Sequence, residues 1–270
     1  MFVLFKITLV LYFLATLTYL ICLYRQRPLF TRAATAFLVG GFITHSFELF
    51  SQCLDLGQAP VTNLPQSLSF FSWTLVAIYL LLQLKYHVIV LGSFLTPLAL
   101  ISILISAVLP GSKEPLDPIL RSYWFPIHVA SAFLGNGFFG LAFCSGIMYL
   151  LQEHQVKGKK MGFFYHRLPS LRILDEMNYR CLTLGFPLLT LGIISGAIWA
   201  EYAWGSYWNW DPKQTWSLIT WLVYAALLHG RLTFGWRGRR AAILSILGFS
   251  VMLFTFVGVN LFLKGAHNFI

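Results

Sequence analysis

Charge is scarce in this chain of 270 residues. Only 10% of the residues are Asp, Glu, Lys or Arg, whereas 58% are hydrophobic. A soluble globular domain carries about a quarter charged residues, so the composition excludes that class. Acidic residues are scarcer than basic ones, nine against nineteen, and the net charge is +10. In so apolar a chain this excess indicates membrane topology rather than a nucleic-acid partner, and we expect no nucleic acid.

Cysteine is also rare, and its spacing excludes two kinds of site. Cys22, Cys53, Cys144 and Cys181 lie in or beside apolar runs, and no Cys-x-x-Cys occurs. A thiol-redox centre or a structural zinc site is therefore not expected, and we interpret these residues as small buried hydrophobes. The first apolar run contains Lys6 and lacks a small-residue cleavage site, which predicts a retained first helix rather than a signal peptide.

What the chain has instead is a series of apolar runs of membrane-spanning length. We predict an all-α, polytopic membrane protein that forms a single integral membrane domain over residues 1–270. About eight transmembrane helices are expected, at residues 4–24, 33–51, 68–84, 87–109, 126–151, 181–200, 215–231 and 241–263.

The basic residues set the orientation of these spans. One set of loops and helix ends holds Arg25, Arg27, Arg32, Lys85, Lys157, Lys159, Lys160, Arg167, Arg172, Arg180, Arg231, Arg237, Arg239 and Arg240. The opposite side holds only Lys6, Lys113, Arg121, Lys213 and Lys264. Because basic residues gather on the cytoplasmic side, both termini and the segment around residues 201–214 are predicted to be non-cytoplasmic.

The longest polar segment is a predicted cytoplasmic loop at about residues 152–180. Within it, Ser170 follows Pro169 and could cap a short helix with Leu171, Leu174 and Met177 on one face. We expect this helix to lie on the cytoplasmic membrane surface.

One stretch combines many aromatic rings with charge. The residues between 199 and 221 include Trp199, Trp204, Trp208, Trp210, Trp216 and Trp221, six of the chain's nine tryptophans. The Asp211-Pro212 pair excludes the middle of a lipid-spanning helix, and Asp211 is predicted to cap a helix that begins near Pro212. One or two such tryptophans would indicate only an interfacial aromatic belt. Six of them favour a platform for a large flat apolar ligand, of which a porphyrin is the obvious candidate.

Two histidines are predicted on the same side of the membrane as this platform. His128 begins the fifth span, and His267 follows the last one. Neutral imidazole is a common axial ligand of haem iron. His229 lies near the other end of the seventh span beside Arg231, and ionisable groups inside a span are functional by default. His45, in the outer part of the second span, is predicted to be a polar core residue, and His87, His154 and His166 to be solvated.

These stretches are similar to a known family. Trp204-Gly205-Ser206-Tyr207-Trp208-Asn209-Trp210-Asp211, followed by Pro212-Lys213-Gln214-Thr215-Trp216, resembles the haem-handling "WWD" segment of cytochrome c assembly proteins. Trp221 to Arg231, with His229-Gly230-Arg231 at its end, narrows the resemblance to the CcsA/ResC branch of the System II pathway. Gln66 and Gln214 stand where this family usually has Glu.

The resemblance implies a function in c-type cytochrome biogenesis. It implies that haem b is the transported substrate, held first at His229 opposite a histidine of a CcsB/ResB-type membrane partner. It then implies an external site made by His128 and His267, with Trp204, Trp208, Trp210 and Asp211 in the WWD segment at about residues 199–221. There haem would be attached to the Cys-x-x-Cys-His segment of apocytochrome c, so the chain would be a component of a cytochrome c synthase (haem lyase) complex. Gly205 would allow close backbone approach to the ligand.

The resemblance also implies a multi-pass protein of the plasma, inner or thylakoid membrane. The alternative is a haem-binding regulatory membrane protein of the HemX type without a synthase role, which the tryptophan motif disfavours. An unrelated transporter with broken helices in paired halves would show internal symmetry, and none is apparent in the sequence.

Overall fold

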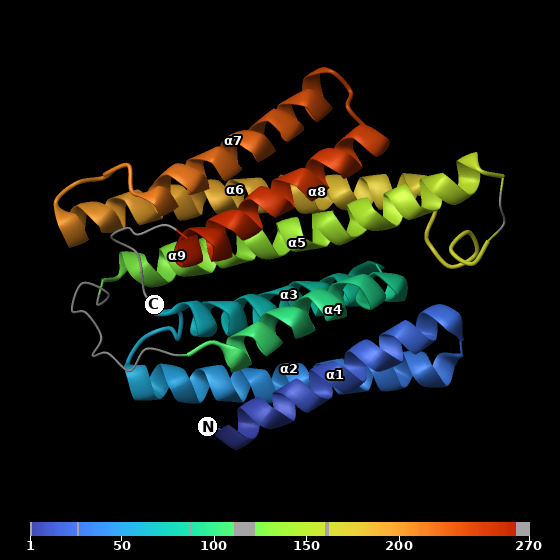
Figure 1. The fold of residues 1–270 in the computed structure, drawn as a ribbon, viewed down its shortest axis with the longest axis horizontal. Coiled ribbons are helices and arrows are strands. Elements are labelled where there is room, and N and C mark those ends of the chain that lie inside the picture. Colours follow the sequence, from blue (N-terminus) through green and yellow to red (C-terminus); the bar gives the residue numbers. More distant parts are fainter. Residues whose placement is uncertain (1, 26, 87, 111–121, 160–161, 263–270) are drawn as a thin grey trace. The chain divides into compact units, whose positions relative to one another are not determined.

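The computed structural model describes residues 2–25, 27–86, 88–110, 122–159 and 162–262, and all regular secondary structure in that part of the chain is helical (Figure 1). The helices are α1 (Phe2–Tyr24), α2 (Pro28–Leu56), α3 (Leu64–Tyr86), α4 (Ile89–Val108), α5 (Trp124–Lys157), α6 (Leu171–Trp204), α7 (Pro212–Thr233), α8 (Arg239–Leu253), the π-helix η2 (Phe254–Gly258) and α9 (Val259–Phe262). They form two compact units, Met1–Leu116 and Asp117–Phe269, and each is described here by itself.

Seven of the helical segments are long and apolar enough to cross a membrane, which confirms a multi-pass, all-α membrane protein. They are α1 to α6 and the run Arg239–Phe262. Helix α7 is not among them, although it occupies the predicted span 215–231. Its Lys213, Gln214, His229 and Arg231 lower its mean hydropathy. That α7 crosses the membrane therefore stays a prediction.

The first unit packs α1 to α4 around buried polar contacts. His45 of α2 is fully buried, and its two ring nitrogens lie 3.2 Å from the Tyr12 hydroxyl and 3.0 Å from the Ser69 hydroxyl. This confirms the predicted polar core residue. At the start of α3 the amide oxygen of Gln66 accepts from the Thr62 N–H at 3.0 Å, so a neutral side chain supplies the acceptor at this helix end.

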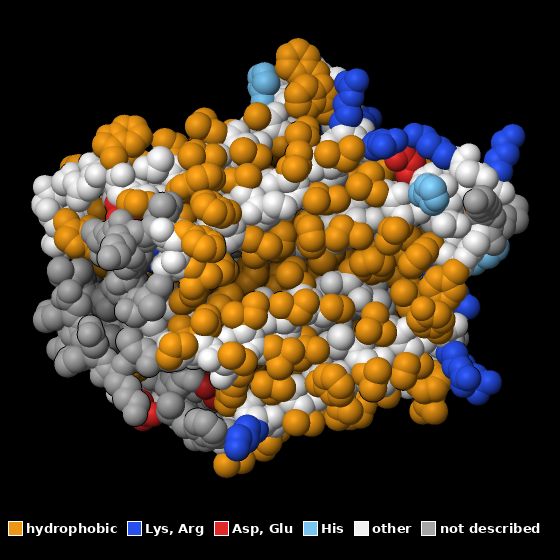
Figure 2. All heavy atoms as spheres, in the orientation of Figure 1, with side chains coloured by type: hydrophobic (Ala, Val, Ile, Leu, Met, Phe, Trp, Pro, Cys, Tyr) orange, Lys and Arg blue, Asp and Glu red, His pale blue; other side chains and the backbone are white. Residues whose placement is uncertain are grey.

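The second unit is an up-and-down bundle of α5 to α8. Phe143 of α5 stacks on Phe249 of α8, and Phe139 stacks on Tyr224 of α7. Figure 2 shows hydrophobic side chains along the exposed length of the helices, with Lys and Arg near helix ends. Exposed leucines such as Leu184, Leu191 and Leu222 are expected where a helix faces lipid.

Small residues bring α5 and α6 close together in antiparallel order. A Cβ on Gly135 would lie 2.8 Å from the Leu189 nitrogen, and a Cβ on Gly192 would lie 3.1 Å from the Ala132 nitrogen. Neither position could accept a larger residue without moving a backbone. Close approach of helices at small residues is typical of membrane proteins, because it maximises packing where lipid gives no hydrophobic driving force.

The prediction of a short surface helix within residues 152–180 is wrong. Ser170 does cap a helix, accepting from the Ile173 N–H at 3.5 Å, but that helix is α6 itself and it continues for 34 residues to Trp204. No glycine or proline interrupts it before Gly185, and Pro187 is accommodated inside it. The polar residues of its first turns made this part of the sequence look like a loop.

Candidate haem site

The tryptophan loop, residues 205–211, joins α6 to α7 and begins at a left-handed glycine. Gly205 has φ 70° and its N–H donates to the Glu201 carbonyl at 2.8 Å, which ends α6. A Cβ at Gly205 would meet nothing within 4 Å. Its left-handed conformation favours glycine here, and the close approach of a ligand to Gly205 stays a prediction.

Short hydrogen-bonded links hold this loop. Ser206 Oγ donates to the Trp208 carbonyl at 3.1 Å, and the Asn209 N–H donates to Gln214 Oε1 at 2.8 Å. Asp211 accepts from the Lys213 N–H at 2.9 Å with Pro212 in the first turn, which confirms Asp211 as the N-cap of α7. Gln214, like Gln66, thus supplies a neutral acceptor to a backbone N–H.

Trp210 is held in a conformation that side chains rarely adopt. Its φ is 54°, and the residue is 70% exposed. A bulky residue in the left-handed region carries local strain that the surrounding contacts must offset. Thr215 Oγ1 donates to the Trp210 carbonyl at 3.3 Å and supplies one such contact.

The indoles of this region form two edge-to-face pairs. The ring centroids of Trp199 and Trp204 are 5.1 Å apart at 66°, and those of Trp208 and Trp210 are 5.9 Å apart at 84°. Trp208 Nε1 is buried and, within the described ranges, has no hydrogen-bond partner. A buried indole N–H without an acceptor is uncommon and marks a place where a ligand oxygen would be stabilised.

The remaining tryptophans of the motif have packing roles. Trp216 lies against Phe254, with centroids 4.4 Å apart, and its carbonyl accepts from Thr255 Oγ1 at 3.2 Å. Both contacts are made by the π-helix η2, a rare form that often occurs at functional sites. Trp221 donates its Nε1 proton to Thr190 at 2.9 Å.

His128 is oriented by one hydrogen bond that leaves its other nitrogen open. Its Nδ1 lies 2.7 Å from the Gly192 carbonyl, which can only accept, so Nδ1 carries the proton and Nε2 carries the lone pair. No residue in the described part of the chain hydrogen-bonds to Nε2. A ring N–H donated to a backbone carbonyl is the usual arrangement of a metal-binding histidine.

The structure places His128 next to a tryptophan that the sequence did not single out as a contact residue. The half-buried imidazole lies along Trp199, with centroids 6.2 Å apart and planes at 18°, and Trp199 in turn contacts Trp204. Gly196 makes room for the ring, since a Cβ there would lie 2.6 Å from His128 Nδ1. Gly192, Gly196 and Trp199 recur at helical spacing, which is the signal that could have predicted this face of α6.

The other predicted histidines fall into three groups. His229 of α7 is exposed and lies edge-on to Phe234, with centroids 5.8 Å apart. His154 and His166 are exposed, as predicted. His267 and His87 lie outside the described residues, so the pairing of His128 with His267 stays a prediction.

Lys213, at the first turn of α7, adds a partly buried positive charge beside the tryptophan loop. Burial lowers the pKa of Lys213 to about 8, and the neighbouring Asp211 carboxylate opposes this shift. The ammonium is thus less stable here than in water, and an anionic group placed close by would stabilise it.

Comparisons with known proteins agree with this picture. A family model described as Cytochrome C assembly protein matches residues 61–267. Cytochrome c biogenesis protein CcsA of Guillardia theta is 37% identical over 246 residues, covering 84% of this chain and 82% of that protein. CcsA of Synechococcus elongatus is 38% identical over 268 residues, covering 82% of each chain.

A solved structure shares the fold. The cytochrome c haem lyase CcmF superposes with a TM-score of 0.65 at 18% identity, over 94% of this chain and 46% of that one. On the family match and the identity to its members, this chain belongs to the CcsA family of cytochrome c assembly proteins, multi-pass membrane proteins of cytochrome c biogenesis.

Proposed function

We propose that this chain carries haem b across the membrane and presents it at an external site for covalent attachment to apocytochrome c. The observation that supports this most strongly is the state of His128. Its Nδ1 proton is donated to the Gly192 carbonyl, so Nε2 is free to bind iron, and its ring lies along Trp199 beside the tryptophan loop. A flat apolar ligand with a metal at its centre needs this combination of imidazole and aromatic surface.

Haem transport uses two sites, one after the other. Haem entering from the cytoplasmic side is bound first by His229, opposite an imidazole from a CcsB/ResB-type partner. The exposure of His229 supports this, because the ring is open to a second protein. Haem then moves to the external site between His128 and His267, where two imidazoles fill both axial positions and limit reaction with oxygen.

Attachment at the external site is an addition reaction. Each thiol of the Cys-x-x-Cys-His segment adds its sulfur and its proton across one vinyl group of haem, forming a thioether bond with no net oxidation. The contribution of this chain is mainly to hold the vinyl edge in place for the thiols. The orphan N–H of Trp208 and the Lys213 ammonium are candidates to orient the polar edge of haem.

Cytochrome assembly in cells that lack this chain tests the proposal. Complementation with His128→Ala or His267→Ala should fail to restore covalently bound haem in c-type cytochromes, whereas the exposed His154→Ala of α5 should restore it fully. Normal assembly with both His128→Ala and His267→Ala would refute the external site. Cells that keep their c-type cytochromes without this chain, but change their haem level, would instead favour the HemX-type regulatory function.

A further inference from the structure

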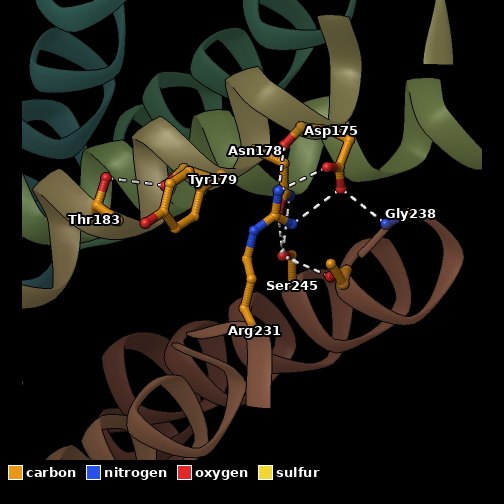
Figure 3. A network of polar contacts seen from close by, with 8 residues as sticks. Asp175, Asn178, Tyr179, Thr183, Arg231, Gly238 and Ser245 are labelled. Carbon is orange, nitrogen blue, oxygen red and sulfur yellow. Dashed lines mark hydrogen bonds and ion pairs between the residues drawn. The ribbon is translucent and has the colours of Figure 1, made fainter. Parts of the chain in front are cut away.

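An ion pair between Asp175 of α6 and the buried Arg231 of α7 (Figure 3) lies near the end of α7 that is farther from the tryptophan loop. Arg231 Nη1 and Nη2 donate to Asp175 Oδ1 and Oδ2 at 2.9 and 2.7 Å, and Nη2 also donates to the Asp175 carbonyl at 3.1 Å. The Arg231 side chain is 6% exposed, and its guanidinium lies 4.7 Å from the centre of the Tyr179 ring. This two-pronged geometry fixes the position of the last turn of α7 against α6.

The same carboxylate also holds the start of the next helix. Asp175 Oδ1 accepts from the Gly238 N–H at 2.8 Å, and Gly238, whose φ is +64°, is the residue that precedes α8. One side chain of α6 therefore fixes both ends of the short linker between α7 and α8.

That linker folds back over the turn that carries His229. The N–H groups of Phe234 and Trp236 both donate to the Gly230 carbonyl, at 3.0 and 3.1 Å. The Trp236 ring covers Gly230 so closely that no Cβ could be added there, and Phe234 contacts His229. The direction of the His229 ring thus depends on the rotation of α7 and on the position of the linker, and Asp175 fixes both.

We propose that Asp175, acting through Arg231 and Gly238, is a positioning residue that holds the His229 imidazole in place to receive haem. At about 100° per residue, His229 and Arg231 point in nearly opposite directions from α7. Fixing Arg231 toward α6 therefore turns His229 outward, toward a partner. This inference rests on the proposed role of His229 as a haem ligand.

A second polar cluster nearby supplies a matched control. Asn178 Nδ2 donates to the Ala142 carbonyl at 2.9 Å and to Ser245 Oγ at 3.0 Å, and these contacts join α6 to α5 and α8. None of them involves α7. Removing the Ser245 hydroxyl should affect helix packing in the same region without turning His229.

The test uses the full chain in detergent, with His128→Ala and His267→Ala introduced so that His229 is the site measured. Asp175→Asn alone would leave a buried guanidinium unpaired, so the main variant is Asp175→Asn with Arg231→Met, which removes both charges together. A second variant, Arg231→Lys, keeps both charges but loses the two-pronged contact. Each is titrated with ferric haem in the presence of imidazole, and its melting temperature is measured.

We expect about a tenfold or greater loss of haem affinity in the double variant, a smaller loss in Arg231→Lys, and no change in Ser245→Ala. Wild-type affinity in the variants that fold would overturn the positioning role and leave Asp175 a purely structural residue. If the double variant does not fold, the haem affinity of Arg231→Lys alone tests the positioning role. If His229→Ala also leaves the affinity unchanged, the proposed function of His229 fails instead, so the two failures are distinguishable.

Discussion

The two ends of the α5–α8 bundle hold their histidines in different ways. At the tryptophan end, the His128 ring itself is fixed, by a hydrogen bond to Gly192 and by contact with Trp199. At the arginine end, the end of the bundle with the Asp175–Arg231 pair, the His229 ring contacts Phe234, and the helix beneath it is fixed by the ion pair. The first arrangement suits a histidine that binds within its own protein, and the second suits one that meets a partner.

His45 of the first unit makes the comparison sharper. Both of its ring nitrogens are hydrogen-bonded, to Tyr12 and Ser69, and it is fully buried. His128 has one ring nitrogen hydrogen-bonded and, among the described residues, no partner for the other. The number of free ring nitrogens therefore separates a structural histidine from a candidate ligand.

The largest expected effect is at the arginine end. Asp175→Asn should destabilise the protein by about 3–5 kcal/mol, because the Arg231 charge stays buried without its partner. His128→Ala should cost far less stability, since it leaves no buried charge unpaired. Chemical unfolding in detergent measures both. Equal effects would mean that the ion pair does not hold the arginine end together.

At the tryptophan end, a single added methyl group should displace the His128 ring. Gly196→Ala places its Cβ 2.6 Å from His128 Nδ1, so the ring must move and its bond to Gly192 must break. Haem affinity at the proposed external site should fall about tenfold or more, as measured by titration in the Soret band. Gly40→Ala is the control, since its Cβ would meet only Leu11, at 3.7 Å. An unchanged affinity in Gly196→Ala would show that the position of the His128 ring does not matter.

Helix caps at the two ends offer a smaller contrast. Asp211 is buried and accepts at 2.9 Å, whereas Ser170 is exposed and accepts at 3.5 Å. Asp211→Ala should cost about 1–2 kcal/mol and Ser170→Ala about 0.5 kcal/mol, both measured by thermal unfolding. The reverse order would mean that the tryptophan loop does not depend on its cap.

The last contrast between the two ends concerns pH. The pKa of Lys213 in the folded protein, about 8, lies below its ordinary value of 10.5, so the unfolded chain binds this proton more tightly. Stability should therefore rise with pH between those two values, and Lys213→Met should flatten that part of the profile. A profile unchanged by Lys213→Met would contradict the partial burial of this ammonium.

Much of the fold could be predicted because apolar runs of spanning length have few other interpretations. Local signals also sufficed for the Asp211 and Ser170 caps, since a cap and its partner lie within three residues. What the sequence could not show were contacts between distant residues. Asp175 and Asn178 looked like parts of a polar loop because their partners, Arg231 and Ser245, lie 56 and 67 residues away.

In the candidate site, too, local features could be predicted from the sequence and contacts between distant residues could not. The tryptophans and His128 were visible as a motif, because each is chemically distinctive. The tautomer of His128 was not, because it depends on the carbonyl of Gly192, 64 residues along the chain. The π-helix that supports Trp216 also has no signal in the sequence, since it differs from the surrounding helix only in its hydrogen bonding.

The absorption spectrum of haem bound to the purified full chain, with and without His128→Ala, tests the central claim most directly. The wild-type protein should show a low-spin spectrum with two imidazole ligands. His128→Ala should lose the low-spin bands of the external site, and added imidazole should restore them. A His128→Ala protein whose spectrum matches that of the wild type without added imidazole would contradict the assignment of His128 as a haem ligand.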